Sequence, residues 1–463
     1  MSDAAAVALP RRRTTWLFLA AAALNGLAYL LLLAPWMGED EPWQLEYATY
    51  VADGHMPWGG VPIPPPSPGQ PDPRELMSTS QLQALRCFGG ITQEQVRARQ
   101  LEILASMRAH GWFARVDWAG VEVERTTFDM VVPNSSATKE KPLYYLIAGH
   151  WMRLCGAQDV EARLWAARIL SWMLYVGTAA AALAFARTLF DDERAALCTA
   201  ALVAFLPMSA RQAALVNNDV LARFFAAVAL WLAVRWLRRR ASLWGLGAAL
   251  VVCALGLSTK TTAVSALAAV GLAVVLRSER IGTRLVPLAA ALAGLAVVGW
   301  LCLRLVFANS PAMPHTLMGF LDDLDTGFSR ANLAKFARTF AGSFAWESRF
   351  LPGALNLVLG AALAAACARL ALAWRRLAHG RELAWCALTL AVQLGMILLH
   401  GVAVGRYLMP MLPVLAALAV AGLVLAARDR ERAARGFALA LVVYDAYFLF
   451  GGLAVHEFLL LGA

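Results

Sequence analysis

Residues 11–41 read RRRTTWLFLAAAALNGLAYLLLLAPWMGEDE, in which an arginine triplet, an apolar run and an acidic triplet follow one another. The apolar run, Thr14 to Leu33, is long enough to cross a bilayer as one helix. Because the arginine triplet precedes it, we expect the N-terminus to stay cytoplasmic and the helix to end on the outer side. The acidic triplet then lies at the outer membrane surface, where carboxylates indicate a functional site.

The composition of the whole chain is that of a membrane protein. Hydrophobic residues make up 60% of the 463 residues, and charged residues only 16%. A soluble protein of this composition would need many helices that are apolar on all sides. The net charge of +10 would suggest nucleic acid in a soluble protein. Here the arginines fall mainly in short loops between apolar runs, so we expect no nucleic-acid partner.

Apolar runs of spanning length recur along the chain and predict about eleven transmembrane helices. They cover residues 14–34, 160–186, 195–211, 219–237, 243–258, 261–276, 285–307, 352–373, 383–402, 407–427 and 436–453. Every second loop between them is rich in arginine, as expected for cytoplasmic loops. The first run is too long for a typical signal peptide, and we interpret it as a retained anchor. The expected fold class is an all-α polytopic membrane protein, with one transmembrane domain over residues 1–453 and a short tail, 454–463.

Two long segments are expected on the outer side of the membrane. The first, 35–142, contains a proline-rich stretch at 61–73 and the pattern of an amphipathic helix at 93–110. The stretch 142–155 that follows is apolar and aromatic but too short to span, which favours a helix lying in the membrane interface. The second long segment, 308–351, carries several charged residues.

Lysine is rare in this chain and falls only in the expected outer segments. Four of the 41 basic residues are lysines, namely Lys139, Lys141, Lys260 and Lys335. A GC-rich genome and chance would explain this distribution. The functional interpretation is that compact ammonium groups bind an anionic ligand such as a lipid phosphate. Lys260 is the most informative, because it interrupts two apolar runs with almost no loop around it.

Two further groups lie near the outer ends of expected helices. Asp219, in VNND after Asn218, either contacts a ligand or stabilises the start of its helix, where the helix dipole favours a carboxylate. Arg406 and Tyr407, in GRYLMP, suit phosphate recognition, although an arginine at this depth can also simply extend its charge to the membrane surface. Metalloprotease, Walker, dinucleotide-binding and α/β-hydrolase motifs do not occur in the sequence.

Several stretches of the sequence, in this order, resemble a known family. They read GEDEPWQLEYATYVADGHMP from position 38, KEKPLYYLIAGHW from 139, ALVAFLPMSARQAALVNNDVLA from 201, GLSTKTTA from 256, FAWESRFLP from 344 and GRYLMPMLP from 405. Together they resemble polyprenyl-phosphate-sugar-dependent glycosyltransferases of the GT-C fold, in the bacterial group related to protein mannosyltransferases and the lipid A aminoarabinose transferase. This chain departs from relatives at Gln44, where many have histidine, and at Lys141, where many have proline.

The resemblance implies a cell-envelope enzyme of the bacterial cytoplasmic (inner) membrane, with its active site on the periplasmic face. It would move a sugar from a polyprenyl-phosphate-linked donor to a glycolipid, polysaccharide or protein acceptor, surrounded by membrane lipid. Asp40 and Glu41 would be catalytic, with Asp40 the general base. Lys139, Lys141, Lys260, Arg406 and Tyr407 would bind the donor phosphate, and Asp219, Asn218, Gln44 and Glu140 would orient donor or acceptor. A divalent cation, Mg²⁺ or Mn²⁺, is compatible with Asp40, Glu41 and Asp219, whereas Gln44 argues against a histidine-assisted metal site.

Two other functions remain open from the sequence. A transporter or flippase of polyprenyl-linked sugars would show internal repeats and charged or broken helices at mid-membrane. We expect instead that the spans are free of ionisable residues, which would cluster at one face. A non-catalytic envelope assembly protein with the same fold is favoured only by Gln44.

Overall fold

The computed structural model describes residues 11–38, 40–58, 84–112, 140–240, 242–277, 340, 343–344, 349–350, 353–377, 379–399 and 405–451. Some predictions concern positions outside these residues: Glu39, Lys139, Lys335, the proline-rich stretch 61–73, the span 285–307, most of the segment 308–351, and the tail 454–463.

Helices make up nearly all of the described chain. The longer ones are α1 (Arg11–Leu32), α2 (Glu41–Ala52), α5 (Gln93–Ala109), α8 (Leu143–Leu154), α9 (Val160–Leu189), α10 (Glu193–Phe205), α11 (Pro207–Ala213), α12 (Asn218–Leu237), α13 (Leu243–Leu257), α14 (Val264–Arg277), α18 (Gly353–Ala373), α19 (Gly380–Leu399), α20 (Leu412–Val420) and α21 (Arg430–Ala446). Short helical turns are η3 (Thr261–Ala263), η5 (Trp374–Arg376), η6 (Gly405–Met411) and η7 (Ala421–Leu425). Two-residue strands β1 (Ser343–Phe344) and β2 (Arg349–Phe350) pair antiparallel.

Six helical segments among the described residues are long and apolar enough to cross a membrane. They are Arg11–Leu32, Val160–Leu189, Asn218–Leu237, Val358–Arg376, Arg406–Leu425 and Arg430–Gly451, and the pair α10 and α11, bent by 58°, would be a seventh. The shorter apolar helices α13 and Thr261–Arg277, together with α19, occupy three more predicted spans. Each predicted span that falls on described residues coincides with helix, and the chain is an all-α, multi-pass membrane protein.

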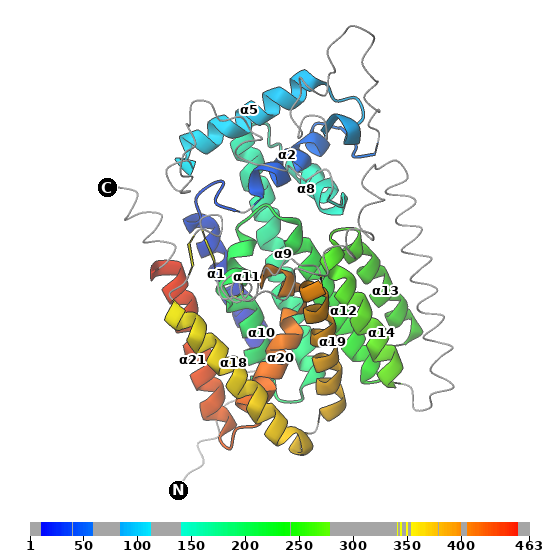
Figure 1. Cartoon of the computed structure of the whole chain (residues 1–463), viewed down its shortest axis with the longest axis vertical. Coiled ribbons are helices and arrows are strands. Elements are labelled where there is room, and N and C mark those ends of the chain that lie inside the picture. Colours follow the sequence, from blue (N-terminus) through cyan, green and yellow to red (C-terminus); the bar gives the residue numbers. More distant parts are fainter. Residues whose placement is uncertain are drawn as a thin grey trace.

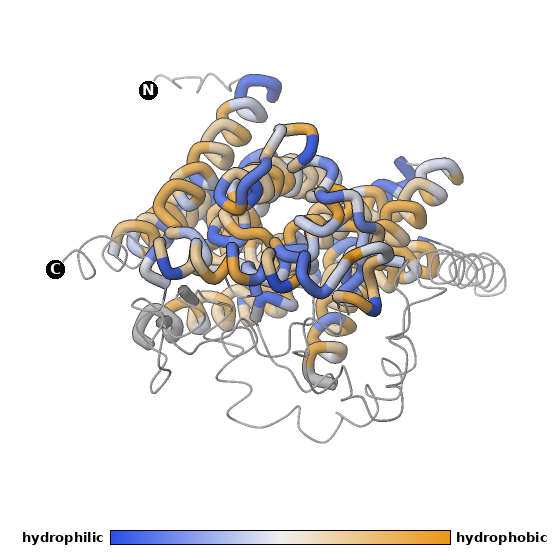
Figure 2. Tube along the Cα trace, turned by 90° about the horizontal axis from the view of Figure 1, so that it is seen from above, coloured by the Kyte–Doolittle hydropathy of each residue, from blue (hydrophilic) through white to orange (hydrophobic). Residues whose placement is uncertain are grey.

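Helices α2, α5 and α8 lie across one end of the bundle, while α1 begins at the opposite end (Figure 1). A capping box between Thr92 and Gln95 starts α5, which buries Val96, Leu104 and Met107, as its amphipathic pattern predicts. Seen from above, hydrophilic stretches cross the middle of the molecule and hydrophobic residues dominate the helices around them (Figure 2). This end of the bundle therefore carries the polar residues that the sequence places on the outer side.

Close packing of α2 against α8 fixes this outer layer. The ring of Tyr47 stacks on that of Tyr145 with centroids 3.9 Å apart. At Gly149 a Cβ atom would lie 2.7 Å from Val51 and 2.8 Å from the carbonyl oxygen of Ala48. Only glycine allows the two backbones to approach this closely, so α8 holds α2, and the residues just before it, in one position.

The prediction that the spans are free of ionisable residues is wrong. Arg168 of α9, Arg223 of α12 and Asp445 of α21 are all buried within membrane-crossing helices. Each has a polar partner on another segment; the hydroxyl of Tyr29, for example, donates to Asp445 Oδ1 over 2.9 Å. Buried charges inside a bundle are tolerated when hydrogen bonds replace the lost water, and apolar periodicity alone does not reveal such partners.

Candidate functional site

Asp40 stands immediately before α2 in a backbone conformation that side chains rarely adopt. Its φ of 65° lies in the left-handed region, which aspartate tolerates better than most residues. Its carbonyl oxygen accepts a hydrogen bond from the amide of Gln44 over 3.0 Å, but its side chain does not cap the helix. Instead, Arg406 Nη2 donates to Asp40 Oδ2 over 3.1 Å, and the Asp40 side chain remains 32% exposed. The backbone thus directs this carboxylate away from its own helix and toward η6.

Glu41 faces the opposite way, into the bundle. Arg168 Nε and Nη2 donate to its two carboxylate oxygens over 2.9 and 2.8 Å, and both side chains are fully buried. The amide of Val216 donates to Glu41 Oε1 over 3.1 Å, and Arg168 also donates to the carbonyl of Leu33 over 2.8 Å. This pair therefore ties the end of α1 and the start of α2 to α9 and to the segment before α12.

Two cations lie against the ring of Tyr407. The guanidinium carbon of Arg406 and the ammonium nitrogen of Lys260 are each 5.7 Å from the centre of that ring. Arg406 and Tyr407 belong to η6, whereas Lys260 joins α13 to η3. The negative face of an aromatic ring attracts cations at this distance, so Tyr407 helps to hold two positive groups in one region.

Lys260 also forms an ion pair with Asp219. Its Nζ lies 2.7 Å from Asp219 Oδ1 and donates to Asn218 Oδ1 over 3.3 Å. Burial disfavours the charged ammonium, but Asp219 and Glu140 outweigh this effect and raise the pKa of Lys260. The second carboxylate oxygen of Asp219, Oδ2, is buried and has no hydrogen-bond partner within the described part of the chain. Lys260 thus stays positively charged while Asp219 keeps one oxygen for another partner.

Gln44 and Glu140 connect this ion pair to the outer layer. The Tyr145 hydroxyl donates to Gln44 Oε1 over 2.7 Å, and the amide of Asn218 lies 3.4 Å from the same oxygen. Asn218 Nδ2 donates to Glu140 Oε2 over 2.9 Å. Lys141 is half-buried beside them, and burial lowers its pKa although Glu140 opposes the shift.

The structure brings most of the predicted site residues together. Contacts join Asp40, Arg406, Tyr407, Lys260, Asp219, Asn218, Glu140 and Gln44 into one polar network beneath α2 and α8. Glu41 binds Arg168 instead, Lys141 lies beside Glu140, and Lys139 is outside the described residues.

Sequence reasoning missed two buried arginines near this network. Arg168 binds Glu41, and Arg223, one turn beyond Asp219 on α12, donates to Gln212 Oε1 over 2.7 Å and to the hydroxyl of Ser209. A charged residue inside an apolar run is itself a signal of function or pairing, and it was available in the sequence.

The carboxylates of this region do not form a metal site in the described part of the chain. Asp40, Glu41 and Asp219 each bind an arginine or a lysine, and no three acidic, histidine or cysteine side chains gather where they could hold an ion. Among the described residues, the side chains therefore do not fit the divalent cation considered from the sequence.

A cavity lies in the outer layer, outside this network. It has a volume of about 240 Å³ between α2 and α5 and is lined in part by Tyr50, Asp53, His55 and Arg99. Asp53 accepts hydrogen bonds from Arg99 over 2.9 Å and from Arg163 over 2.6 Å. These ion pairs join α5 to α2 and α9, so the cavity is held by the same contacts that fix the layer.

The helices and the network define a multi-pass membrane protein of the GT-C fold. Residues 139–302 match the family described as dolichyl-phosphate-mannose-protein mannosyltransferase. That segment contains Glu140, Lys141, Asn218, Asp219 and Lys260 of the network. The GT-C fold expected from the resemblance is therefore confirmed, and residues 139–302 resemble this family of mannosyltransferases. No curated protein matches the chain by sequence.

Among solved structures, the chain is similar to ArnT from Cupriavidus metallidurans. The form bound to undecaprenyl phosphate gives a TM-score of 0.52 at 16% identity, over 94% of this chain and 64% of that chain. The apo form gives 0.52 at 16% identity, over 96% of this chain and 77% of that chain. The apo oligosaccharyltransferase from Archaeoglobus fulgidus gives a TM-score of 0.48 at 12% identity, over 96% of this chain and 56% of that chain. The chain thus spans 64% of the ArnT chain with bound undecaprenyl phosphate, and at 16% identity the similarity to ArnT establishes the fold alone.

Proposed function

We propose that this protein is an integral membrane glycosyltransferase of the bacterial cytoplasmic membrane. It would move a sugar from a polyprenyl-phosphate donor to an acceptor hydroxyl at the outer face. The observation that carries this proposal is the contact between Asp40 and Arg406, which joins a partly exposed carboxylate to the cations around Tyr407. A base beside positive groups, at the polar end of an apolar bundle, suits a substrate that combines a hydroxyl with a lipid phosphate.

The cations of the network would bind the donor phosphate. The guanidinium of Arg406 can bind two phosphate oxygens at once, and the ammonium of Lys260, which also lies against the Tyr407 ring, adds a compact charge. Lys141, which follows Glu140 in the chain and interacts with it electrostatically, would add a third positive charge. As the bond between sugar and phosphate breaks, charge grows on the phosphate, and fixed cations stabilise that growing charge.

Asp40 would accept the proton of the acceptor hydroxyl. The acceptor oxygen attacks the anomeric carbon of the sugar while the bond from that carbon to the phosphate oxygen breaks. The phosphate leaves with the bonding electron pair and stays attached to its lipid, and the hydroxyl proton moves to the Asp40 carboxylate. A positioned base of this kind accelerates a reaction by about 10²–10⁴-fold.

Arg406 has a second role in this proposal, because Asp40 and the donor phosphate would compete for its guanidinium. A phosphate that binds Arg406 draws the arginine away from Asp40 Oδ2 and leaves that oxygen free to accept a proton. The base would therefore become available when the donor is bound, which would limit side reactions in the absence of donor.

The other carboxylates would position rather than react. Glu41 fixes the chain next to Asp40 through Arg168, and both of its oxygens already accept hydrogen bonds. Asp219 keeps Oδ2 for a hydroxyl of the sugar, while its Oδ1 holds Lys260. Gln44 receives the hydroxyl of Tyr145 and thereby holds the outer layer over the network.

The decisive experiment removes only the charge of Asp40. Purified Asp40→Asn protein, incubated with polyprenyl-linked sugars from membrane extract, is expected to lose transfer by about 10²–10⁴-fold while it still binds donor. Glu102→Gln is the control, because it neutralises an exposed carboxylate of α5 in the same outer layer. Transfer by Asp40→Asn at the wild-type rate would remove Asp40 from the mechanism.

The bent pair α10 and α11, together with buried Arg223, keeps a flippase of polyprenyl-linked sugars as a second candidate. Broken helices with nearby charges are typical of transporters. Reconstitution in vesicles separates the two functions. Movement of the donor between leaflets without loss of its sugar would favour the flippase, whereas release of the sugar onto an acceptor favours the transferase. A wild-type protein that does neither would favour the non-catalytic assembly role.

A further inference from the structure

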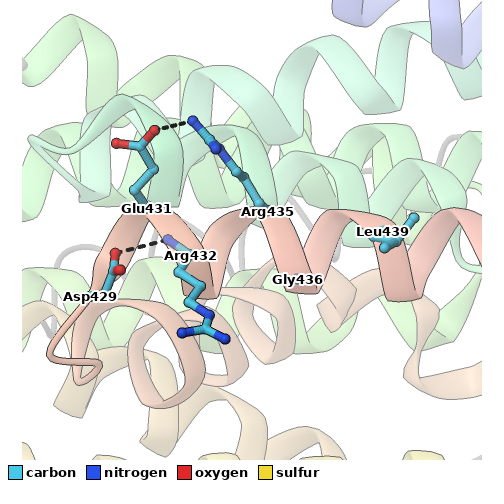
Figure 3. A pocket seen from close by; sticks show the side chains of 6 residues that line it. All are labelled: Asp429, Glu431, Arg432, Arg435, Gly436 and Leu439. Atoms are coloured by element: carbon cyan, nitrogen blue, oxygen red, sulfur yellow. Dashed lines mark hydrogen bonds and ion pairs between the residues drawn. The ribbon is translucent and has the colours of Figure 1, made fainter.

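We propose that a groove at the start of α21 binds the headgroup phosphate of an anionic phospholipid. The groove has a volume of about 520 Å³ and is lined by Asp429, Glu431, Arg432, Arg435, Gly436 and Leu439 (Figure 3). Glu431 of the groove pairs with Arg194 over 3.1 Å, and the adjacent Glu193 lies 3.8 Å from Arg11 at the beginning of α1. The groove therefore lies at the end of the bundle opposite α2 and α8 (Figure 1) and is independent of the proposed transfer site.

Two arginines and two carboxylates line this groove, and further arginines flank it. Between Arg428 and Arg435 the sequence has four arginines and two acidic residues. Glu431 is already engaged by Arg435 and by Arg194. Asp429 accepts a hydrogen bond from the backbone amide of Arg432 over 2.9 Å and so caps the helix. Both acidic side chains thus already have partners within the protein.

Arg432 is the arginine of this groove that is open to a ligand. Its guanidinium extends away from Asp429 and Glu431, while Arg435 turns toward Glu431 (Figure 3). No carboxylate among the described residues forms an ion pair with the Arg432 side chain, which is exposed. An exposed guanidinium beside a concave surface, with the partial positive charge of a helix start nearby, favours a phosphate.

The shape of the groove favours a lipid over a soluble anion. Around the position of a Cβ at Gly436 no atom lies within 4 Å, so open space continues past the arginines. Beyond it Leu439 is 65% exposed, and Val443, at 59%, extends the same face of α21. Positions 432, 436, 439 and 443 follow α-helical spacing, so one face of α21 passes from charge to apolar surface. A phospholipid matches this arrangement of charged and apolar surface, because its phosphate can lie at Arg432 and an acyl chain along the apolar residues.

The test measures which lipid stays bound to the intact protein. The full chain is purified in micelles that contain equal amounts of phosphatidylglycerol and phosphatidylcholine, and retained lipid is counted by native mass spectrometry. We expect preferential retention of phosphatidylglycerol. Arg432→Ala should weaken it about fivefold, the usual contribution of one basic residue at an anionic membrane surface. Arg435→Ala should have a smaller effect, because Glu431 already neutralises that arginine.

Two further variants separate this site from general surface charge. Arg375→Ala with Arg376→Ala removes exposed arginines of η5 without touching the groove, and should leave lipid retention unchanged. Gly436→Leu fills the groove but keeps all its charges; leucine suits an exposed helix position, so the variant should fold and yet lose the bound lipid. Retention by Gly436→Leu at the wild-type level, or an equal loss in the η5 variant, would overturn the proposal.

A competition experiment distinguishes a lipid from a free phosphate. Excess glycerol phosphate carries the same charged group without acyl chains, and it should not displace phosphatidylglycerol from the wild-type protein. Displacement by glycerol phosphate would instead indicate a site for a soluble anion and would refute the lipid assignment. Loss of sugar transfer in Asp40→Asn has no bearing on this result, so the two proposals fail independently.

Discussion

Removal of the Glu41 side chain tests whether this carboxylate acts on substrate or holds the site in place. In Glu41→Ala the guanidinium of Arg168 stays fully buried and loses two hydrogen bonds, of 2.8 and 2.9 Å, to a carboxylate. The amide of Val216 loses its acceptor as well. Breaking a buried ion pair from one side costs about 3–5 kcal/mol, since the remaining charge has neither water nor a partner.

The assay is the fraction of detergent-solubilised protein that remains monodisperse after heating. Heat denaturation of membrane proteins is commonly irreversible, so midpoints of variants are compared under one protocol. Glu41→Ala and Arg168→Ala should each lower the midpoint strongly, whereas Glu41→Ala combined with Arg168→Met should recover much of the loss, because no unpaired charge remains. Asp40→Asn should retain the wild-type midpoint. A Glu41→Ala protein that melts like the wild type but has lost transfer would refute the structural role and return Glu41 to the catalytic group.

Three further predictions concern the lysines, the metal and the packing of the outer layer. Burial lowers the pKa of Lys141, so this ammonium should lose its proton, and transfer should decline, at a lower pH than an ordinary lysine would give. Lys141→Arg should move that alkaline decline to higher pH in a pH–rate profile, and an unchanged profile would exclude Lys141 from phosphate binding. Because Asp40, Glu41 and Asp219 are already paired with cations, EDTA should leave transfer unchanged, and a loss that Mg²⁺ restores would contradict this view. Gly149→Val should lower the thermal midpoint by overpacking against Val51, at a cost of about 1–3 kcal/mol, and Gly271→Ala, at an open helix position, is the control.

The sequence was sufficient to predict the helices of the bundle. Apolar runs of spanning length are long, strongly patterned signals, and each one that falls on described residues is helical. The amphipathic helix at 93–110 and the short helix at 142–155 were also predictable, because α5 alternates buried and charged faces and α8 is too short to span. In both cases the deciding information is local, within one or two turns of helix.

Pairing between distant residues was not predictable in the same way. Glu41 and Arg168 lie 127 residues apart, and no local pattern indicates that both oxygens of that carboxylate are occupied. The sequence placed Asp40 and Glu41 together as catalytic residues, yet with Asp40 at a positive φ these two consecutive carboxylates have different partners, Arg406 and Arg168. A backbone conformation of this kind depends on the tertiary contacts around it, which composition and periodicity do not report.

Charge pairing also suggests why the network suits a phosphate rather than a neutral ligand. Asp40 with Arg406, and Asp219 with Lys260, are matched pairs at low exposure, so each charge lowers the cost of burying the other. A neutral ligand that separated either pair would leave a buried charge without a partner. The full free-energy cost of burying that unpaired charge would then weaken binding of the ligand. A phosphate replaces the carboxylate as the partner of Arg406, so the arginine remains paired and only Asp40 changes its environment. Asp40 is the more exposed member, 32% against 14% for Arg406, and water or an acceptor hydroxyl can solvate it once it is released. The exchange therefore costs least at the carboxylate that the proposed reaction needs as a base.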